Sequence, residues 1–116
     1  MSEKPESVGR EVLYEVADHI AIVTLNRPDK RNAVNGDVAA AMDWIVNEVE
    51  NSDVRVAILT SSLESTFCAG ADLSEISKGN AHKLSTKKGG FAGFAKFPRT
   101  KPWIAAVHGN ALAGGC

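Results

Sequence analysis

The stretch Val54–Leu73, VRVAILTSSLESTFCAGADL, decides the fold because it joins a strand to a turn of small residues. Its first part, Val54–Thr60, is rich in aliphatic and β-branched residues, which predicts a buried strand. A polar turn over Ser61–Thr66 follows, and Leu73–Ser77 predicts one helical turn. Ligands of parallel sheets bind beyond the carboxyl ends of the strands. The turn around Gly70 is therefore predicted to face a ligand.

Upstream of this stretch, the sequence predicts a β-hairpin followed by a loop. Two short β-like runs, Glu11–Ala17 and His19–Asn26, flank Asp18, and this close spacing is typical of a hairpin. The second run is apolar on both faces, as expected for a strand that is covered on both sides. We expect it to end before Pro28, because proline lacks an N–H and biases the preceding residue away from helix.

A single amphipathic helix is predicted between the hairpin and the strand at Val54. Asn35 is its expected N-cap, and the pattern ends at Asn51–Asp53. Its apolar residues recur at helical spacing and predict one core-facing stripe: Val38, Ala41, Met42, Ile45 and Val49. The order strand, helix, strand predicts a right-handed crossover and a parallel sheet, and therefore an α/β fold.

Downstream, the sequence predicts a loop, a short helix and a second strand. The segment Ser77–Gly90 has no steady apolar period, so we expect a mobile lid or loop there. Phe91–Phe97 predicts a short helix that ends at Pro98, and Trp103–Val107 predicts another buried strand. That strand runs into the glycine-rich turn Gly109–Cys116.

The two turns after the strands share one design. Small residues let a ligand approach the backbone, and glycine permits the φ angles that direct N–H groups toward it. Two such turns facing each other would supply paired donors to one developing oxyanion, each worth about 3 kcal/mol. Either turn alone is also common as plain structure. The second, Gly109–Gly114, mimics a dinucleotide-binding fingerprint, but it comes last in the chain and lacks the acidic residue that should follow.

Composition and charge limit the classes of protein that fit. The chain has 116 residues, 44% of them hydrophobic and 23% charged, which fits one domain over residues 11–116. The polar start, Met1–Arg10, predicts a flexible tail rather than a secretory signal. The sequence contains no run of about 18 apolar residues, so no membrane span is predicted. Two cysteines without metal-ligand spacing predict no metal site and no disulfide framework, so a cytoplasmic location is expected.

Charge is distributed unevenly along the chain. All 14 acidic residues precede Lys78, whereas the rest holds seven Lys or Arg residues and no acid. This asymmetry indicates either an anion-binding face or a surface that packs against an acidic segment. Nucleic-acid binding is not expected, because no aromatic residues interleave with the lysines in a recognised motif.

Three blocks of the sequence resemble the crotonase (enoyl-CoA hydratase/isomerase) family. They lie at Asn26–Asn35, Phe67–Leu73 and Lys101–Cys116, in the family's order and at its usual spacing. The resemblance spans Val12–Cys116 and implies a crotonase-like spiral of ββα repeats, incomplete at the C-terminus. It also implies a substrate, acyl-coenzyme A, that carries the coenzyme as part of itself, so no separate cofactor is expected.

The resemblance also implies roles for individual residues. The backbone N–H groups of Ala71 and Gly114 would form an oxyanion hole for the thioester carbonyl. Contacts with the substrate or coenzyme A would come from a set of residues around the turns and the first loop: Arg31, Ala33, Ala69, Gly70, Asp72, Leu73 and Leu112. The basic side chains of Arg27 and Lys30 would also suit the neighbourhood of phosphates.

The implied reaction is the addition of water to a 2-enoyl-CoA in fatty acid metabolism. In the family's hydratases a glutamate follows the block that matches Gly114–Cys116, and a second acid lies further on, so both would fall beyond this chain. The chain alone is therefore expected to be inactive, and the complete enzyme to form trimers or dimers of trimers. Isomerase, hydrolase or decarboxylase chemistry stays open, as does a non-catalytic fragment or interaction module; a nicotinamide-binding domain fits less well.

Four further residue types have simpler interpretations. Cys68 is expected to be a core residue rather than a nucleophile, because its motif holds no histidine. His108 is expected to be structural or exposed, and Asp72 to cap a helix. Trp44 and Trp103 are expected to pack in the core.

Overall fold

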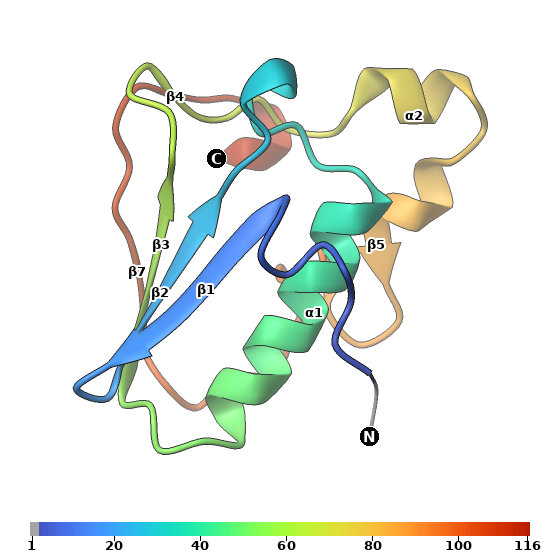
Figure 1. The fold of residues 1–116 in the computed structure, drawn as a ribbon. Coiled ribbons are helices and arrows are strands. Elements are labelled where there is room, and N and C mark those ends of the chain that lie inside the picture. The colour runs from blue at the N-terminus through green and yellow to red at the C-terminus, as the bar shows by residue number, and fades with distance from the viewer. Residues whose placement is uncertain (1–2) are drawn as a thin grey trace.

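The computed structural model describes residues 3–116 and is built on one mixed sheet (Figure 1). Its strand order is β1-β2-β3-β7, with β1 antiparallel to β2 and the other neighbours parallel. The strands span β1 Val12–Ala17, β2 Ile20–Leu25, β3 Val56–Ser61 and β7 Trp103–Ala105. Two strands and then a helix recur along the chain, which confirms the predicted α/β fold of ββα repeats.

The predicted hairpin forms β1 and β2. Asp18 and His19 connect the strands with φ angles of 52° and 66°. Two positive φ angles suit the right-handed twist of the flanking strands, as in the two-residue turns that favour hairpins. The loop after β2 contains the 3₁₀ helix η1, Pro28–Lys30, so the strand ends before the proline as predicted.

Helix α1, Gly36–Glu50, makes the crossover from β2 to β3 and packs on one face of the sheet (Figure 1). The Asn35 side chain accepts a hydrogen bond from the Val38 N–H at 3.0 Å, which confirms the predicted N-cap. The predicted stripe is buried throughout: Val38, Ala41, Met42, Ile45 and Val49. It packs in one core cluster with apolar residues of β1, β2 and β3.

A second, two-stranded parallel sheet brings the two glycine turns together. It consists of β4, Thr66–Cys68, and β8, Asn110–Ala111. Gly109 precedes β8 with φ +74°, and a Cβ there would lie 2.1 Å from the carbonyl carbon of Ser65. Only glycine fits so close to the neighbouring backbone, so this approach depends on it.

The segment after β4 contains short elements. Helix α2, Leu73–Ser77, is the predicted helical turn. The 3₁₀ helix η2, Ala81–Leu84, and the hairpin of β5, Ser85–Thr86, with β6, Gly90–Phe91, follow it. The hydroxyl of Thr86 donates to the Asp43 carboxylate of α1, which ties the hairpin to the helix. The predicted mobility of residues 77–90 stays a prediction.

The predicted short helix at Phe91–Phe97 is wrong. After β6, residues 92–96 form successive hydrogen-bonded turns. Ala92 and Gly93 have φ angles of 59° and 66°, which a right-handed helix cannot contain. Gly93 also lies against α1, where an added Cβ would be 2.2 Å from the Ala39 carbonyl oxygen. Close packing on α1 therefore overrides the helical spacing of the phenylalanines.

The predicted buried strand at Trp103–Val107 is wrong in length and in burial. β7 ends at Ala105, and the side chains of Ile104 and Val107 are 54% and 50% exposed. Within residues 3–116, β7 pairs with β3 only, so its other edge is open. Trp103 does pack, edge to face on Phe94 with ring centroids 5.1 Å apart. Trp44 packs in the same manner on Tyr14.

The remaining elements lie at the two ends of the chain. Residues 5–12 form a hydrogen-bonded turn with Ser7 buried, whereas Met1 and Ser2 lie outside the described residues; the predicted flexibility of residues 1–10 stays a prediction. The 3₁₀ helix η3, Ala113–Gly115, follows β8 beside the turn after β4. None of the helices in residues 3–116 has the length and apolar character that a membrane crossing requires.

Candidate functional site

The two glycine turns touch each other at Gly70. Gly70 has φ +97°, and a Cβ built there would lie 2.9 Å from the Leu112 carbonyl oxygen and 3.2 Å from the Gly114 nitrogen. Leu112 N–H donates to the Cys68 carbonyl at 3.0 Å and holds the second turn on the first. The structure thus brings Ala71 and Gly114, which the sequence places 43 positions apart, into one site.

The Ala71 N–H has a fixed direction. Val34 N–H donates to the Gly70 carbonyl at 2.7 Å, and Asp72 N–H donates to the Val34 carbonyl at 2.9 Å. In a trans peptide the N–H points away from the C=O of the same unit, so the Ala71 N–H points away from Val34. No hydrogen bond within residues 3–116 uses the Ala71 or the Gly114 N–H as donor. Both are therefore available to an incoming acceptor.

A cleft of about 840 Å³ opens beside these two donors. Seven of the nine predicted site residues line it: Arg31, Ala33, Ala69, Ala71, Asp72, Leu73 and Gly114. Lys30 adds a second cation to its wall. The other two predicted residues do not line the cleft. Gly70 is buried in the first turn against the Leu112 carbonyl, and Leu112 itself is largely exposed.

An apolar pocket of about 510 Å³ adjoins the same site. It lies between α1 and the sheet, with Met42, Phe94 and Trp103 among its lining residues. Gly114 lines both the cleft and this pocket. The second donor therefore stands where a cleft with charged side chains in its wall meets an apolar pocket.

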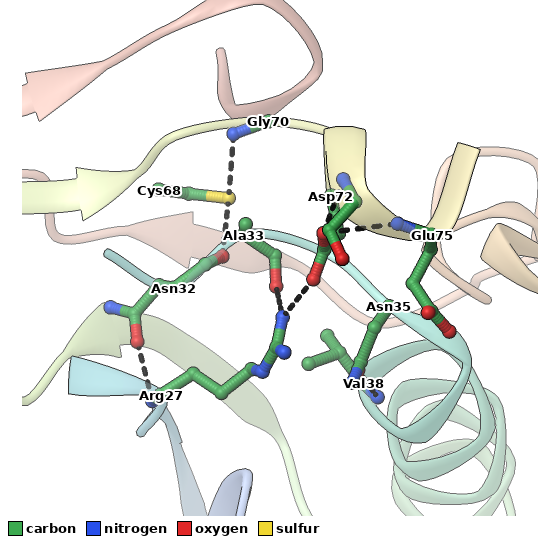
Figure 2. Close-up of polar contacts among 10 residues, drawn as sticks. Arg27, Asn32, Ala33, Asn35, Val38, Cys68, Gly70, Asp72 and Glu75 are labelled. Carbon is green, nitrogen blue, oxygen red and sulfur yellow. Dashed lines mark hydrogen bonds and ion pairs between the residues drawn. The ribbon is translucent and has the colours of Figure 1, made fainter. Parts of the chain in front are cut away.

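Arg27 is held inside the protein, contrary to the expectation that it lies beside phosphates (Figure 2). Its Nη1 donates to Asp72 Oδ2 and to the Ala33 carbonyl, each at 2.8 Å. The Arg27 and Asp72 side chains are 15% and 7% exposed. Asp72 Oδ1 accepts from the N–H groups of Ser74 and Glu75, which confirms the predicted helix cap. The hydrogen bond from Arg27, helped by these N–H groups, holds the Asp72 pKa below its usual range.

Asn32 is the main site residue that sequence reasoning missed. It is buried, and its Nδ2 donates to Ser61 Oγ at 2.8 Å and to the Phe67 carbonyl at 2.9 Å. Its Oδ1 accepts from the Arg27 N–H at 2.7 Å. Asn32 also adopts a left-handed backbone with φ 58°, which asparagine tolerates better than most residues. The sequence feature that could have indicated this role is the position of Asn32 at the end of a polar loop.

Cys68 and His108 are placed as structural residues. Cys68 is buried, and its thiol donates to the Asn32 carbonyl at 3.1 Å. Burial raises the pKa of this thiol, which disfavours the thiolate that a nucleophile needs. His108 is exposed, and its ring Nε2 is hydrogen-bonded to the Leu63 carbonyl.

The cleft holds donors for an anion but little acid–base machinery. Its carboxylates among the described residues are Asp29 and Asp72, and Asp72 is occupied by Arg27 and two N–H groups. Residues 3–116 contain no cluster of three His, Cys, Asp or Glu side chains that could hold a metal ion. The arrangement can bind and polarise a carbonyl, whereas proton transfer needs a further group.

Comparison with known proteins gives consistent results. The family model described as enoyl-CoA hydratase/isomerase matches residues 15–116. A short-chain-enoyl-CoA hydratase from Clostridium acetobutylicum is 44% identical over 90% of this chain. The solved carnitinyl-CoA hydratase from Mycobacterium avium aligns with a TM-score of 0.83 and 39% identity over 91% of this chain. A probable enoyl-CoA hydratase/isomerase from Mycobacterium abscessus aligns with a TM-score of 0.81 and 42% identity over 90% of it. This chain spans 41%, 41% and 40% of the lengths of these three proteins.

Proposed function

Because the chain belongs to the enoyl-CoA hydratase/isomerase family, we propose that the complete protein adds water to a 2-enoyl-CoA thioester. In this reaction the oxygen of water bonds to C3, and the electrons of the double bond move toward the thioester carbonyl. The carbonyl oxygen carries this negative charge as an oxyanion until a proton arrives at C2. Stabilisation of this oxyanion is the task we assign to the described residues.

The observation that carries the proposal is the pair of unoccupied N–H donors at Ala71 and Gly114 on two touching turns. Each preorganised donor stabilises a developing oxyanion by about 3 kcal/mol. Since Gly114 borders both the cleft and the apolar pocket, a carbonyl held there would have its coenzyme in the former and its acyl chain in the latter.

The two cavities differ in ways that suit the two ends of an acyl-CoA. Lys30 and Arg31 line the cleft, where they would face the negative phosphates of coenzyme A. Backbone groups of Ala69, Asp72 and Leu73 would contact its adenine end, and Ala33 would lie along its pantetheine portion. The apolar pocket would take a hydrocarbon acyl chain. Coenzyme A is then part of the substrate, and no separate cofactor is proposed.

The acid and base of the reaction are proposed to lie outside this chain. Hydration needs one group to activate water and another to deliver a proton, and backbone donors do neither. The chain spans 41% of the Clostridium hydratase, which leaves ample family length for such groups. On this proposal the complete protein is a cytoplasmic lyase that assembles as a homo-oligomer, and residues 1–116 alone are inactive.

Turnover of crotonyl-CoA by the protein expressed from its complete reading frame tests the proposal. We expect loss of the enoyl-thioester absorbance and formation of the 3-hydroxyacyl-CoA. A 3-enoyl-CoA tested in parallel would reveal isomerase chemistry in the same hole. If neither thioester is converted, the proposed function is wrong.

The variant pair Gly114→Pro and Gly114→Ala tests the placement of the hole. Proline removes the N–H, and we expect turnover to fall about 100- to 1000-fold. Alanine keeps the N–H, and its Cβ would meet only the far edge of the Phe91 ring at 2.8 Å, which a small rotation of that side chain relieves, so most of the turnover should remain. Equal turnover in wild type and Gly114→Pro would show that the second donor lies elsewhere.

A further inference from the structure

We propose that Arg27 is a positioning residue that strengthens the Ala71 N–H as an oxyanion donor through two intervening peptide groups. The inference rests on the proposed function. Helix capping by Asp72 does not require Arg27, since the cap uses Oδ1 and the arginine binds Oδ2. The cap does not explain why the largely buried guanidinium of Arg27 also donates one Nη1 hydrogen to the backbone carbonyl of Ala33.

A continuous hydrogen-bond chain leads from Arg27 to Ala71. Arg27 Nη1 donates to the Ala33 carbonyl at 2.8 Å. The N–H of the same peptide unit belongs to Val34 and donates to the Gly70 carbonyl at 2.7 Å. The N–H of that next unit belongs to Ala71 and has no acceptor within residues 3–116. Because each trans peptide carries its C=O and N–H on opposite sides, the chain runs in one direction and ends on Ala71.

The polarity of this chain favours an anion at its end. A cation on the Ala33 oxygen draws electron density through the peptide and makes the Val34 N–H a stronger donor. The Val34 N–H does the same to the Gly70–Ala71 peptide. Such cooperative strengthening is about 10–30% per bond in condensed phase. The charge that develops on a thioester oxygen during reaction would therefore meet a donor strengthened from behind.

Asp72 and Asn32 keep Arg27 at the head of the chain. The Asp72 carboxylate takes the other hydrogen of Nη1, so the guanidinium bridges the segments that carry Ala33 and Asp72 (Figure 2). The amide of Asn32 accepts from the Arg27 N–H at 2.7 Å and fixes its backbone. Behind the Gly114 N–H stands only a backbone donor within residues 3–116, since the Cys116 N–H donates to the Ala113 carbonyl at 3.0 Å and no charged side chain bonds to that peptide unit. The two proposed donors are thus unequal.

The test compares Arg27→Met, Arg27→Lys and the control Arg55→Met in the protein expressed from its complete reading frame. Arg55 is exposed and lines neither cavity, so its variant removes a guanidinium without touching the site. The probe is cinnamoyl-CoA, a conjugated thioester whose absorbance moves to longer wavelength when its carbonyl is polarised. The shift is read at saturating protein, and kcat and KM are measured with crotonyl-CoA.

We expect Arg27→Met to lower kcat about tenfold with a smaller change in KM, and to reduce the shift of the bound probe. Arg27→Lys keeps a cation near the Ala33 carbonyl, so its kcat and its probe shift should lie between those of Arg27→Met and wild type. Arg55→Met should match wild type. A purely structural role predicts instead a lower melting temperature and weaker binding, with an unchanged probe shift once saturated.

The outcomes separate this inference from the proposed function. If wild type neither binds the probe nor shifts its absorbance, the proposed function is wrong. If wild type shifts the probe and Arg27→Met shifts it equally, only the role of Arg27 is wrong. Should Arg27→Met fail to fold, Arg27→Gln decides the matter, because it removes the charge behind the Ala33 carbonyl, and an unchanged shift and kcat in that variant would overturn the inference.

Discussion

The turn Cys68–Leu73 and the turn Gly109–Cys116 do the same proposed task with very different support. The first forms backbone hydrogen bonds with Arg31, whose carbonyl accepts from the Ala69 N–H, and with Val34, and it is tied by a largely buried ion pair. The second is largely exposed, with the Leu112 side chain 55% exposed and no side-chain cap on η3. It is held chiefly by the bond from Leu112 N–H to the Cys68 carbonyl and by the pairing of β8 with β4.

The difference indicates a division of labour between the two donors. A donor whose direction is already fixed needs no reorganisation when charge appears, which is the source of its effect. The first turn meets that condition through its own contacts. The second is positioned largely by the first, so damage to the first turn should disable both donors, whereas the reverse should not hold.

The largest expected effect follows from closing the contact between the turns. Gly70→Ala places a Cβ 2.9 Å from the Leu112 carbonyl oxygen at φ +97°. We expect the free energy of unfolding to fall by about 2–4 kcal/mol, from backbone strain and overpacking. Gly79→Ala is the matched control, since Gly79 has φ +80° and open space around it, and it should cost only about 1 kcal/mol. Equal losses in urea unfolding would show that the turns do not press on each other.

Removal of the Asn32 amide should weaken the first turn by a slightly smaller amount. Asn32→Ala removes the hydrogen bonds to the Phe67 carbonyl and from the Arg27 N–H, and one of the several bonds of Ser61 Oγ, at a cost of about 2–3 kcal/mol. Asn32→Gly loses the same bonds but adopts φ 58° without strain, so it should be about 1 kcal/mol less destabilised. Urea unfolding of both variants measures the difference. If Asn32→Ala lowered the free energy of unfolding by less than about 0.5 kcal/mol, as substitutions at exposed positions do, the role of Asn32 would be contradicted.

Acid should selectively weaken the ion pair of the first turn. The Asp72 pKa is lowered in the folded protein, chiefly by the Arg27 hydrogen bond, so its stabilisation is full above the usual carboxyl range and is lost as the pH falls through the lowered value. The free energy of unfolding of wild type should exceed that of Asp72→Asn by about 1–2 kcal/mol at neutral pH. The gap should close in acid when unfolding free energies are measured at both pH values. A gap that is independent of pH would mean that the charge of Asp72 does not matter.

The smallest expected effect lies in the second turn and has the opposite sign. Ala113 has φ 47°, a conformation that strains any residue with a Cβ. Ala113→Gly should therefore raise the free energy of unfolding by less than about 1 kcal/mol. Thermal unfolding measures it. A clear destabilisation would show that the second turn depends on the Ala113 side chain, and the contrast between the turns would then be smaller than described.

The sequence predicted what local patterns and the family blocks encode. The stripe from Val38 to Val49 and its Asn35 cap predicted α1, and the family blocks placed Ala71 and Gly114 in one site. The pairing of Arg27 with Asp72 was missed because it joins residues 45 positions apart and leaves no periodic signal. The turns after Phe91 were predicted as helix, since their left-handed backbone depends on a hydrogen bond from the Ala92 N–H to the Leu84 carbonyl and on the packing of Gly93 against α1, which no local pattern encodes.

A crystal structure of the complete protein with a bound, unreactive acyl-CoA thioester tests the central claim most directly. We predict that the thioester oxygen lies about 3 Å from both the Ala71 and the Gly114 nitrogen atoms, with the coenzyme along the cleft of Lys30 and Arg31. A thioester oxygen that contacts neither nitrogen, or a coenzyme bound away from this cleft, would contradict the account.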